Sequence, residues 1–115
     1  MRMDTELFLD MLKTDSTSGK EAGFADFLAE RLLTPHCRVE KFDVGDGTVN
    51  LLFSWGKPEV VFCSHLDTVP PYIPPTIEGD VVKGRGSCDA KGQIFAMYEA
   101  CKELESKGYD GFGLL

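Results

Sequence analysis

The sequence lacks several features that would each point to a different class of protein. It has no cluster of basic residues. In total, 12 Lys and Arg stand against 19 Asp and Glu, which gives a net charge of -7. This balance argues against nucleic acid or an anionic membrane as a partner. No apolar run approaches the roughly 20 residues that cross a bilayer, and acidic residues near the start replace the regions of a signal peptide. We therefore expect a cytoplasmic protein that binds neither nucleic acid nor membrane.

Cysteine is present, but in no pattern that holds a structural metal. The four cysteines (Cys37, Cys63, Cys88 and Cys101) form no C-x-x-C pair, so a zinc knuckle is not expected. In a reducing compartment they are predicted to be free thiols, mostly buried as small apolar groups. A cysteine-dependent hydrolase using Cys63 or Cys88 stays open as an alternative, and it would be sensitive to alkylation and not to chelators.

The spacing of apolar residues predicts the elements of about one domain, which fits a length of 115 residues. We predict helices over residues 5–13, between residues 18 and 35, and from residue 94 to Gly108, and strands over 38–44, 50–55 and 59–64, a hairpin over 76–83 and the start of another strand at 111–115. Asp4 is the expected N-cap of the first helix. Ser18 and Glu21 stand three residues apart, which predicts a capping box at the second. We therefore assign the polar turn before that helix no direct chemical role.

Strands that alternate with helices are typical of an α/β sheet, in which ligand sites lie beyond the carboxyl ends of the strands. The strand over residues 59–64 contains the run Val-Val-Phe-Cys, which is apolar without alternation. This pattern predicts a strand whose two faces are both covered. The residues that directly follow it are therefore the first place to look for a site.

The most informative stretch is residues 63–70, where His65 and Asp67 follow the end of this strand. Side chains two residues apart in a strand point to the same face, so the imidazole and the carboxylate are expected to share one site. Imidazole and carboxylate are the usual zinc ligands when cysteine is not used, and a metal-bound histidine nearly always has an acceptor on its other nitrogen. The pair can be a ligand and its orienting partner, or two groups of one metal site; a surface pair in a loop is the plain alternative.

A second acidic segment follows at residues 84–92, which read Gly-Arg-Gly-Ser-Cys-Asp-Ala-Lys-Gly. Asp89 stands at the start of a predicted helix, where the helix dipole favours a carboxylate, and a carboxylate can bridge two metals. The glycines allow sharp turns and close approach to a ligand. A dinucleotide fingerprint is excluded, because its third glycine would fall at Asp89, whose charge would repel a pyrophosphate. Together the two segments indicate a metal-dependent hydrolase.

Residues 64–70 and 84–92 closely resemble the two N-terminal signatures of a zinc amidohydrolase family. That family includes acetylornithine deacetylase, succinyl-diaminopimelate desuccinylase, carboxypeptidase G and the aminoacylases. Residues 16–21, Ser-Thr-Ser-Gly-Lys-Glu, also match its first helix-entry segment. The resemblance covers nearly the whole chain. It implies an α/β three-layer sandwich with a mostly parallel central sheet, of which residues 1–115 would form the N-terminal part of the zinc-binding catalytic domain.

The resemblance also implies a role for each matched residue. His65 would ligate one zinc ion, Asp67 would orient His65 as a catalytic residue, and Asp89 would bridge two zinc ions, for which cobalt can substitute. A cis peptide would follow Asp89. The implied reaction is hydrolysis of an amide bond, in an N-acyl amino acid or a small peptide, by a zinc-activated water. Acetylornithine-type deacylation is slightly favoured over dipeptide cleavage by the likeness of residues 84–92.

The family pattern also contains parts that these 115 residues do not show. Its general base is a glutamate of a Glu-Glu pair, and further metal ligands and a lid and dimerisation domain lie later still. We therefore expect an N-terminal piece of a longer enzyme that by itself binds zinc weakly and hydrolyses nothing. A homodimer is expected for the full-length enzyme only. The alternative is a non-catalytic α/β module that keeps the fold for binding or assembly.

Overall fold

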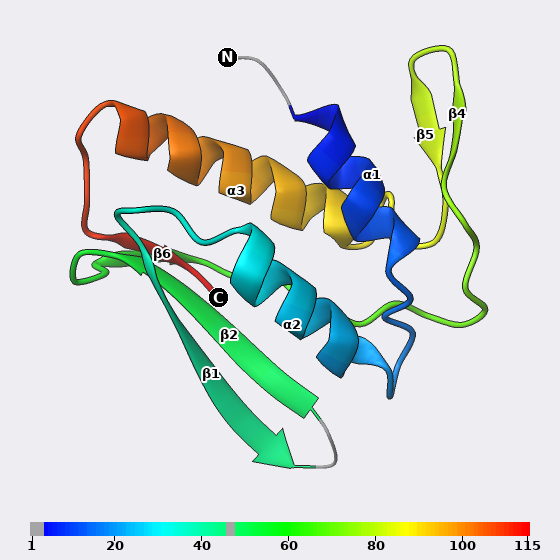
Figure 1. Cartoon of the computed structure of the whole chain (residues 1–115), viewed down its shortest axis with the longest axis horizontal. Helices are drawn as coiled ribbons and strands as arrows, with labels where there is room; N and C mark the ends of the chain where they lie inside the picture. The colour runs from blue at the N-terminus through cyan, green and yellow to red at the C-terminus, as the bar shows by residue number, and fades with distance from the viewer. Residues whose placement is uncertain (1–3, 46–47) are drawn as a thin grey trace.

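The computed structural model describes residues 4–45 and 48–115. The helices are α1 (Thr5–Lys13), α2 (Glu21–Arg31) and α3 (Lys91–Ser106), and the strands are β1 (Arg38–Gly45), β2 (Thr48–Trp55), β3 (Val60–Phe62), β4 (Thr76–Glu78), β5 (Val81–Lys83) and β6 (Phe112–Leu114) (Figure 1). Each predicted helix and strand is present in the predicted order. Asp4 caps α1 as predicted, because its Oδ1 accepts a hydrogen bond from the backbone N–H of Leu7 at 3.0 Å. Among the described residues, no helix is both long and apolar enough to cross a membrane.

Four strands form the main sheet in the order β1-β2-β6-β3, and β4 and β5 form a separate hairpin. β3 and β6 are parallel, whereas β1–β2 and β2–β6 are antiparallel. A parallel pair needs a long crossover connection, and α3 lies within the one between β3 and β6. The α/β class is confirmed. Within the described strands the sheet is mixed, and its parallel part is the β3–β6 pair. The loop that follows the carboxyl end of β3 carries His65 and Asp67.

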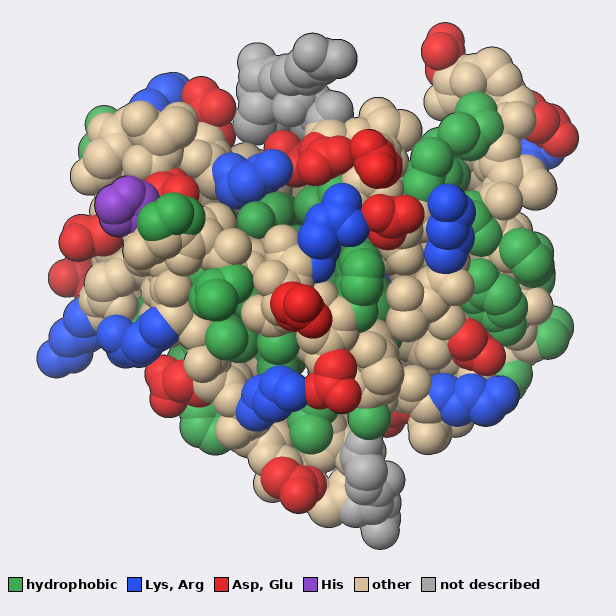
Figure 2. Space-filling model, in the orientation of Figure 1, with side chains coloured by type: hydrophobic (Ala, Val, Ile, Leu, Met, Phe, Trp, Pro, Cys, Tyr) green, Lys and Arg blue, Asp and Glu red, His purple; other side chains and the backbone are tan. Residues whose placement is uncertain are grey.

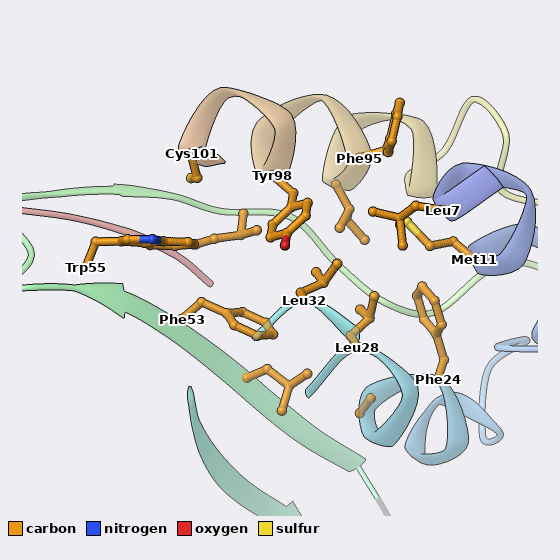
Figure 3. Packing of buried hydrophobic residues seen from close by; sticks show 14 of the residues in the cluster. Leu7, Met11, Phe24, Leu28, Leu32, Phe53, Trp55, Phe95, Tyr98 and Cys101 are labelled. Atoms are coloured by element: carbon orange, nitrogen blue, oxygen red, sulfur yellow. The ribbon is translucent and has the colours of Figure 1, made fainter. Parts of the chain in front are cut away.

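The three helices and one face of the sheet share a single core. Alternate residues of β2, Leu51, Phe53 and Trp55, are buried in it, as period-two alternation requires. Trp55 stacks on Phe112 of β6 with ring centroids 5.0 Å apart. Figure 3 shows Phe53 and Trp55 reaching from β2 toward Tyr98 of α3. The core thus fixes α3, and with it the residues that precede α3, over the sheet.

The prediction that both faces of the third strand are covered is wrong for the described chain. Val60 is 60% exposed and Val61 is 45% exposed. β3 lies at one end of the sheet order, and the helices pack on a single core. An unalternating apolar run was therefore not a reliable sign of burial here, because an edge position cannot be read from composition.

Charged side chains cover much of the outer surface of α1 and α2. On the face drawn in Figure 2, lysine and arginine side chains are interspersed with aspartate and glutamate. Arg31 of α2 and Asp10 of α1 form such a pair, with Nη1 and Oδ2 2.9 Å apart. Exposed pairs of this kind contribute about 0–1 kcal/mol to stability, so the core rather than the surface holds these helices together.

Candidate metal centre

Two separate segments meet beyond the carboxyl end of β3. His65 and Asp67 lie in the loop after this strand, which ends at Phe62, and Asp89 lies two residues before α3 begins at Lys91. The premise that His65 and Asp67 share a strand face is therefore wrong. The two side chains nevertheless come together, with Nδ1 of His65 3.2 Å from Oδ1 of Asp67. The loop, and not the pleat of a strand, brings them to one side.

Both ring nitrogens of His65 face acceptors. Nδ1 is 3.0 Å from the backbone carbonyl oxygen of Asp67, and Nε2 is 3.0 Å from Oδ1 of Asp89. A carbonyl oxygen can only accept, so Nδ1 must carry the hydrogen in that bond. The Nε2 atom is thereby directed at the Asp89 carboxylate. The His65 side chain is 50% exposed and that of Asp89 is 78% exposed, so a small solute can reach both.

The surroundings of His65 raise its pKa above the ordinary value of 6.5. Partial burial of the ring lowers the pKa, but the hydrogen bond with Asp89, the hydrogen bond with the carbonyl of Asp67 and the charges of both carboxylates outweigh it. The imidazolium form satisfies both acceptors with an N–H group. A metal cation bound at Nε2 would offset the negative charges of Asp67 and Asp89 in place of the proton on Nε2.

The donor chemistry fits two positions of a divalent-metal site. An imidazole nitrogen and a carboxylate oxygen are ordinary zinc ligands, and a second acceptor on Nδ1 is what a metal-bound histidine usually has. A zinc site commonly uses three or four protein ligands. Within residues 4–45 and 48–115, no group of three or more His, Cys, Asp or Glu side chains could hold a metal ion. His65 and Asp89 are therefore two donors of an incomplete set.

The segment that carries Asp89 is held in one shape by close packing. The peptide bond between Asp89 and Ala90 is cis, as the family resemblance implies. Gly86 has a φ of +91°, and a Cβ there would lie 3.0 Å from Cγ2 of Thr68 in the loop of His65. A Cβ on Gly92 would collide with the backbone carbonyl oxygen of Ser87. Two of the glycines singled out in the sequence are thus required by close approach of the chain to itself.

Lys91 has a buried position that its sequence context does not indicate. Its side chain is 1% exposed, and its Nζ donates to the backbone carbonyl oxygens of Met11 at 2.9 Å and Thr14 at 2.6 Å. These carbonyls belong to the end of α1, where the helix dipole favours a cation. The ammonium also lies 4.2 Å from the ring centroid of Phe24. Lys91 therefore ties the start of α3, two residues after Asp89, to α1. A lysine in a helical pattern is normally exposed, so no local signal indicated this role.

The buried ammonium predicts a pH dependence of stability. Burial lowers the pKa of Lys91 from its ordinary 10.5 to about 8. As the pH rises through 8, the folded chain therefore loses this proton while the unfolded chain still keeps it. Stability from this group therefore rises with pH. Between pH 7 and pH 9 we expect the free energy of unfolding of the chain, minus that of a Lys91→Met variant, to increase by about 1 kcal/mol.

Urea unfolding of the two chains at a series of pH values measures this difference. Burial also raises the pKa of Tyr98 and of Cys101 to about 12, which lowers stability as the pH rises above 9. These groups are present in both chains and cancel in the comparison. A difference that does not change between pH 7 and pH 9 would contradict a charged, buried Lys91.

The polar turn before α2 contacts the site, which corrects the expectation of a simple capped helix start. The N-cap residue of α2 is Lys20, which makes no side-chain capping bond. The Glu21 carboxylate accepts instead from the N–H of Gly19 at 2.7 Å, and the Ser18 hydroxyl donates to Oδ2 of Asp67 at 3.2 Å. The capping-box prediction is wrong, because Ser18 has a partner 49 residues away that a local pattern cannot reveal.

The cysteines are free thiols, as predicted, but they are not mostly buried. Cys101 is buried in the core, Cys37 is half-buried, and Cys63 and Cys88 are exposed. The two exposed thiols lie in the segments of His65 and Asp89, which are open to solvent because they form the site. Both nitrogens of His65 face aspartates, so this imidazole is not oriented to act as the base for Cys63.

A pocket of about 290 Å³ opens beside His65. Its lining is largely apolar and includes Leu28 of α2, Phe53 of β2, Ile94 of α3 and Leu114 of β6. The candidate site therefore lies at the rim of an apolar hollow between the sheet and the helices.

The segment that contains these donors matches a known family. Residues 61–113 match the model of Peptidase family M20/M25/M40. This part of the chain belongs to that family. His65, Asp67 and Asp89 all lie inside the M20 segment, and Ser18 lies before it.

Nearly the whole chain is similar to part of several known proteins and solved structures. It is 38% identical over 108 residues to a peptidase M20 domain-containing protein of Schizosaccharomyces pombe, covering 89% of this chain and 27% of that protein. It is 36% identical over 104 residues to the LysW-lysine/LysW-ornithine hydrolase of Sulfurisphaera tokodaii, and the match covers 90% of this chain and 28% of that protein. The structure of a tripeptidase of Staphylococcus aureus shares the fold, with a TM-score of 0.77 at 22% identity. The match covers 96% of this chain and 34% of the tripeptidase. The chain thus spans between about a quarter and a third of these M20-like proteins.

Proposed function

We propose that this chain forms part of the catalytic domain of a metal-dependent hydrolase that cleaves amide bonds in N-acyl amino acids or small peptides. The observation that carries the proposal is the meeting of His65 Nε2 and Asp89 Oδ1 at 3.0 Å, across 24 residues of sequence, with Asp67 on the other ring nitrogen. Membership of the M20 family over residues 61–113 supports it. The chain would contribute the first donors of the site.

Zinc is the metal that we propose for this site, with His65 and Asp89 as the residues that would hold it and Asp89 as the bridge if two ions bind. A zinc ion there would supply a Lewis acid that polarises the scissile carbonyl and lowers the pKa of water. The chain's own residues prepare the site. The Asp67 carbonyl keeps the proton of His65 on Nδ1, and the Asp67 carboxylate lies against the same nitrogen and stabilises charge on the ring.

The substrate class is supported by the names of the relatives. One is a hydrolase of LysW-lysine and LysW-ornithine, and a protein with the same fold is a tripeptidase. Both names describe hydrolysis of a bond to an amino acid or peptide. Within this class, we propose an acetylornithine deacetylase-like activity as the finer assignment. A homodimer of the full-length enzyme belongs to the same proposal.

Zinc titration of the chain, followed by calorimetry, tests the proposed function. We expect weak, saturable zinc binding, and no measurable hydrolysis of N-acetylornithine or dipeptides by these 115 residues alone, because two donors fall short of the three or four of a typical zinc site. Absence of zinc binding would contradict the proposal and favour a non-catalytic module. Hydrolysis by the 115-residue chain that a chelator abolishes would contradict the expected inactivity. Hydrolysis that alkylation abolishes and a chelator does not would favour a cysteine nucleophile.

A further inference from the structure

We propose that Ser18 is a positioning residue for the metal centre, acting on His65 through Asp67. This inference rests on the proposed function for its purpose, but its geometry is independent of any metal. The Ser18 hydroxyl donates to Oδ2 of Asp67 at 3.2 Å, and Oδ1 of the same carboxylate lies 3.2 Å from Nδ1 of His65. Ser18 thus restrains one carboxylate oxygen while the other faces the ring.

The backbone around Ser18 is anchored to the same loop at several points. The N–H of Ser18 donates to the carbonyl oxygen of Thr68 at 3.0 Å, and the N–H of Thr68 donates to the carbonyl oxygen of Ser16 at 2.9 Å. Thr17 and Thr68 form a parallel bridge. The Ser16 hydroxyl donates to the carbonyl oxygen of Leu66 at 2.8 Å. Residues 16–18 therefore lie beside residues 66–68 like two short strands.

This anchoring makes the hydroxyl of Ser18 different from an ordinary surface serine. A free serine side chain that contacts a carboxylate must lose rotational freedom in both groups. Here the Ser18 backbone is already held beside Thr68, the residue that follows Asp67. The hydrogen bond therefore needs little further ordering, and it can select the orientation of the Asp67 carboxylate.

The orientation of Asp67 matters because His65 lies between competing acceptors. Asp89 faces Nε2, and the carbonyl and carboxylate of Asp67 face Nδ1. A neutral ring has one N–H, and it must stay on Nδ1 if Nε2 is to offer a lone pair to a metal. By holding the Asp67 carboxylate on the Nδ1 side, Ser18 favours this tautomer over the one that donates to Asp89.

The test compares Ser18→Ala with Ser18→Thr and Ser16→Ala. The Ser18→Thr variant keeps the hydroxyl. The Ser16→Ala variant removes a hydrogen bond from the same turn to the same loop without touching the Asp67 carboxylate. Ser18 is exposed, so its variants are expected to fold. The first readout is the tautomer ratio of His65, measured in the zinc-free chain by nitrogen-15 NMR at a pH where the ring is neutral. His36, the other histidine, is the internal reference.

We expect Ser18→Ala to lower the ratio of the Nδ1–H to the Nε2–H tautomer about fivefold, since hydrogen bonds to charged groups are among the stronger ones. Zinc affinity, the second readout, should fall about tenfold, as for other residues that orient a ligand. The Ser18→Thr and Ser16→Ala variants should stay within about twofold of the wild type in both readouts. An unchanged ratio in Ser18→Ala, or an equal change in Ser16→Ala, would overturn the inference. If the wild type binds no zinc, the proposed function fails while the tautomer ratio still decides the role of Ser18.

Discussion

Replacing His65 with alanine is expected to weaken zinc binding by the chain about a hundredfold or more, since changing even a residue that only orients a ligand costs 10–100-fold. His65 provides the nitrogen donor of the candidate site, and its Nε2 faces Oδ1 of Asp89 at 3.0 Å. Without the ring, Asp89 is a single exposed carboxylate, which holds zinc no better than other surface acids. Isothermal calorimetry or competition with a fluorescent chelator measures the change.

The matched control is His36→Ala. His36 is exposed and lies outside the segments that form the site, so this variant removes a histidine and leaves the two donors in place. We expect its zinc affinity to equal that of the wild type. Equal weakening in both variants would show that zinc binds histidines non-specifically. Undiminished binding in His65→Ala would place the metal elsewhere and remove the basis of the proposed function.

Replacing Gly92 with alanine is expected to destabilise the chain by about 3 kcal/mol, at the upper end of the cost of overpacking. A Cβ at this position would collide with the backbone carbonyl oxygen of Ser87. Backbone atoms cannot rotate away as a flexible side chain can. Relief of the clash would therefore move residues 87–90, which carry Asp89, relative to the start of α3. Urea unfolding measures the loss, and zinc affinity should fall with it.

Gly23→Ala provides the control within a helix of the same chain. Gly23 lies inside α2, and a Cβ there would meet nothing within 4 Å. Because alanine has the higher helix propensity, we expect this variant to be more stable than the wild type by about 0.5–1 kcal/mol. Opposite signs for two glycine-to-alanine changes would locate the constraint in the contact with Ser87. A Gly92→Ala variant as stable as the wild type would show that the Asp89 segment relaxes freely.

Most of the fold could be predicted from local patterns. The helical spacing in α1 and α3 and the turn residues that separate the strands depend on neighbours a few positions away, and these predictions agree with the structure. The errors concern distant partners. The local pattern predicts a capping box at Ser18, but this residue contacts Asp67. It predicts a covered strand at Val60, but this residue is exposed at the edge of the sheet. Neither partner nor edge position is a property of the local sequence.

For the candidate site, the donors can be identified from the sequence: an imidazole and a carboxylate two residues apart in His65 and Asp67, and a second carboxylate in Asp89, within a glycine-rich segment. That these side chains meet depends on the packing of distant segments. The parallel β3–β6 pair and α3 over the core bring Asp89 to Nε2, and Lys91 joins that segment to α1. The chemistry of a ligand belongs to a single side chain, and so it can be read from the sequence. The 3.0 Å between Nε2 of His65 and Oδ1 of Asp89 is set by the packing of elements that are far apart in sequence.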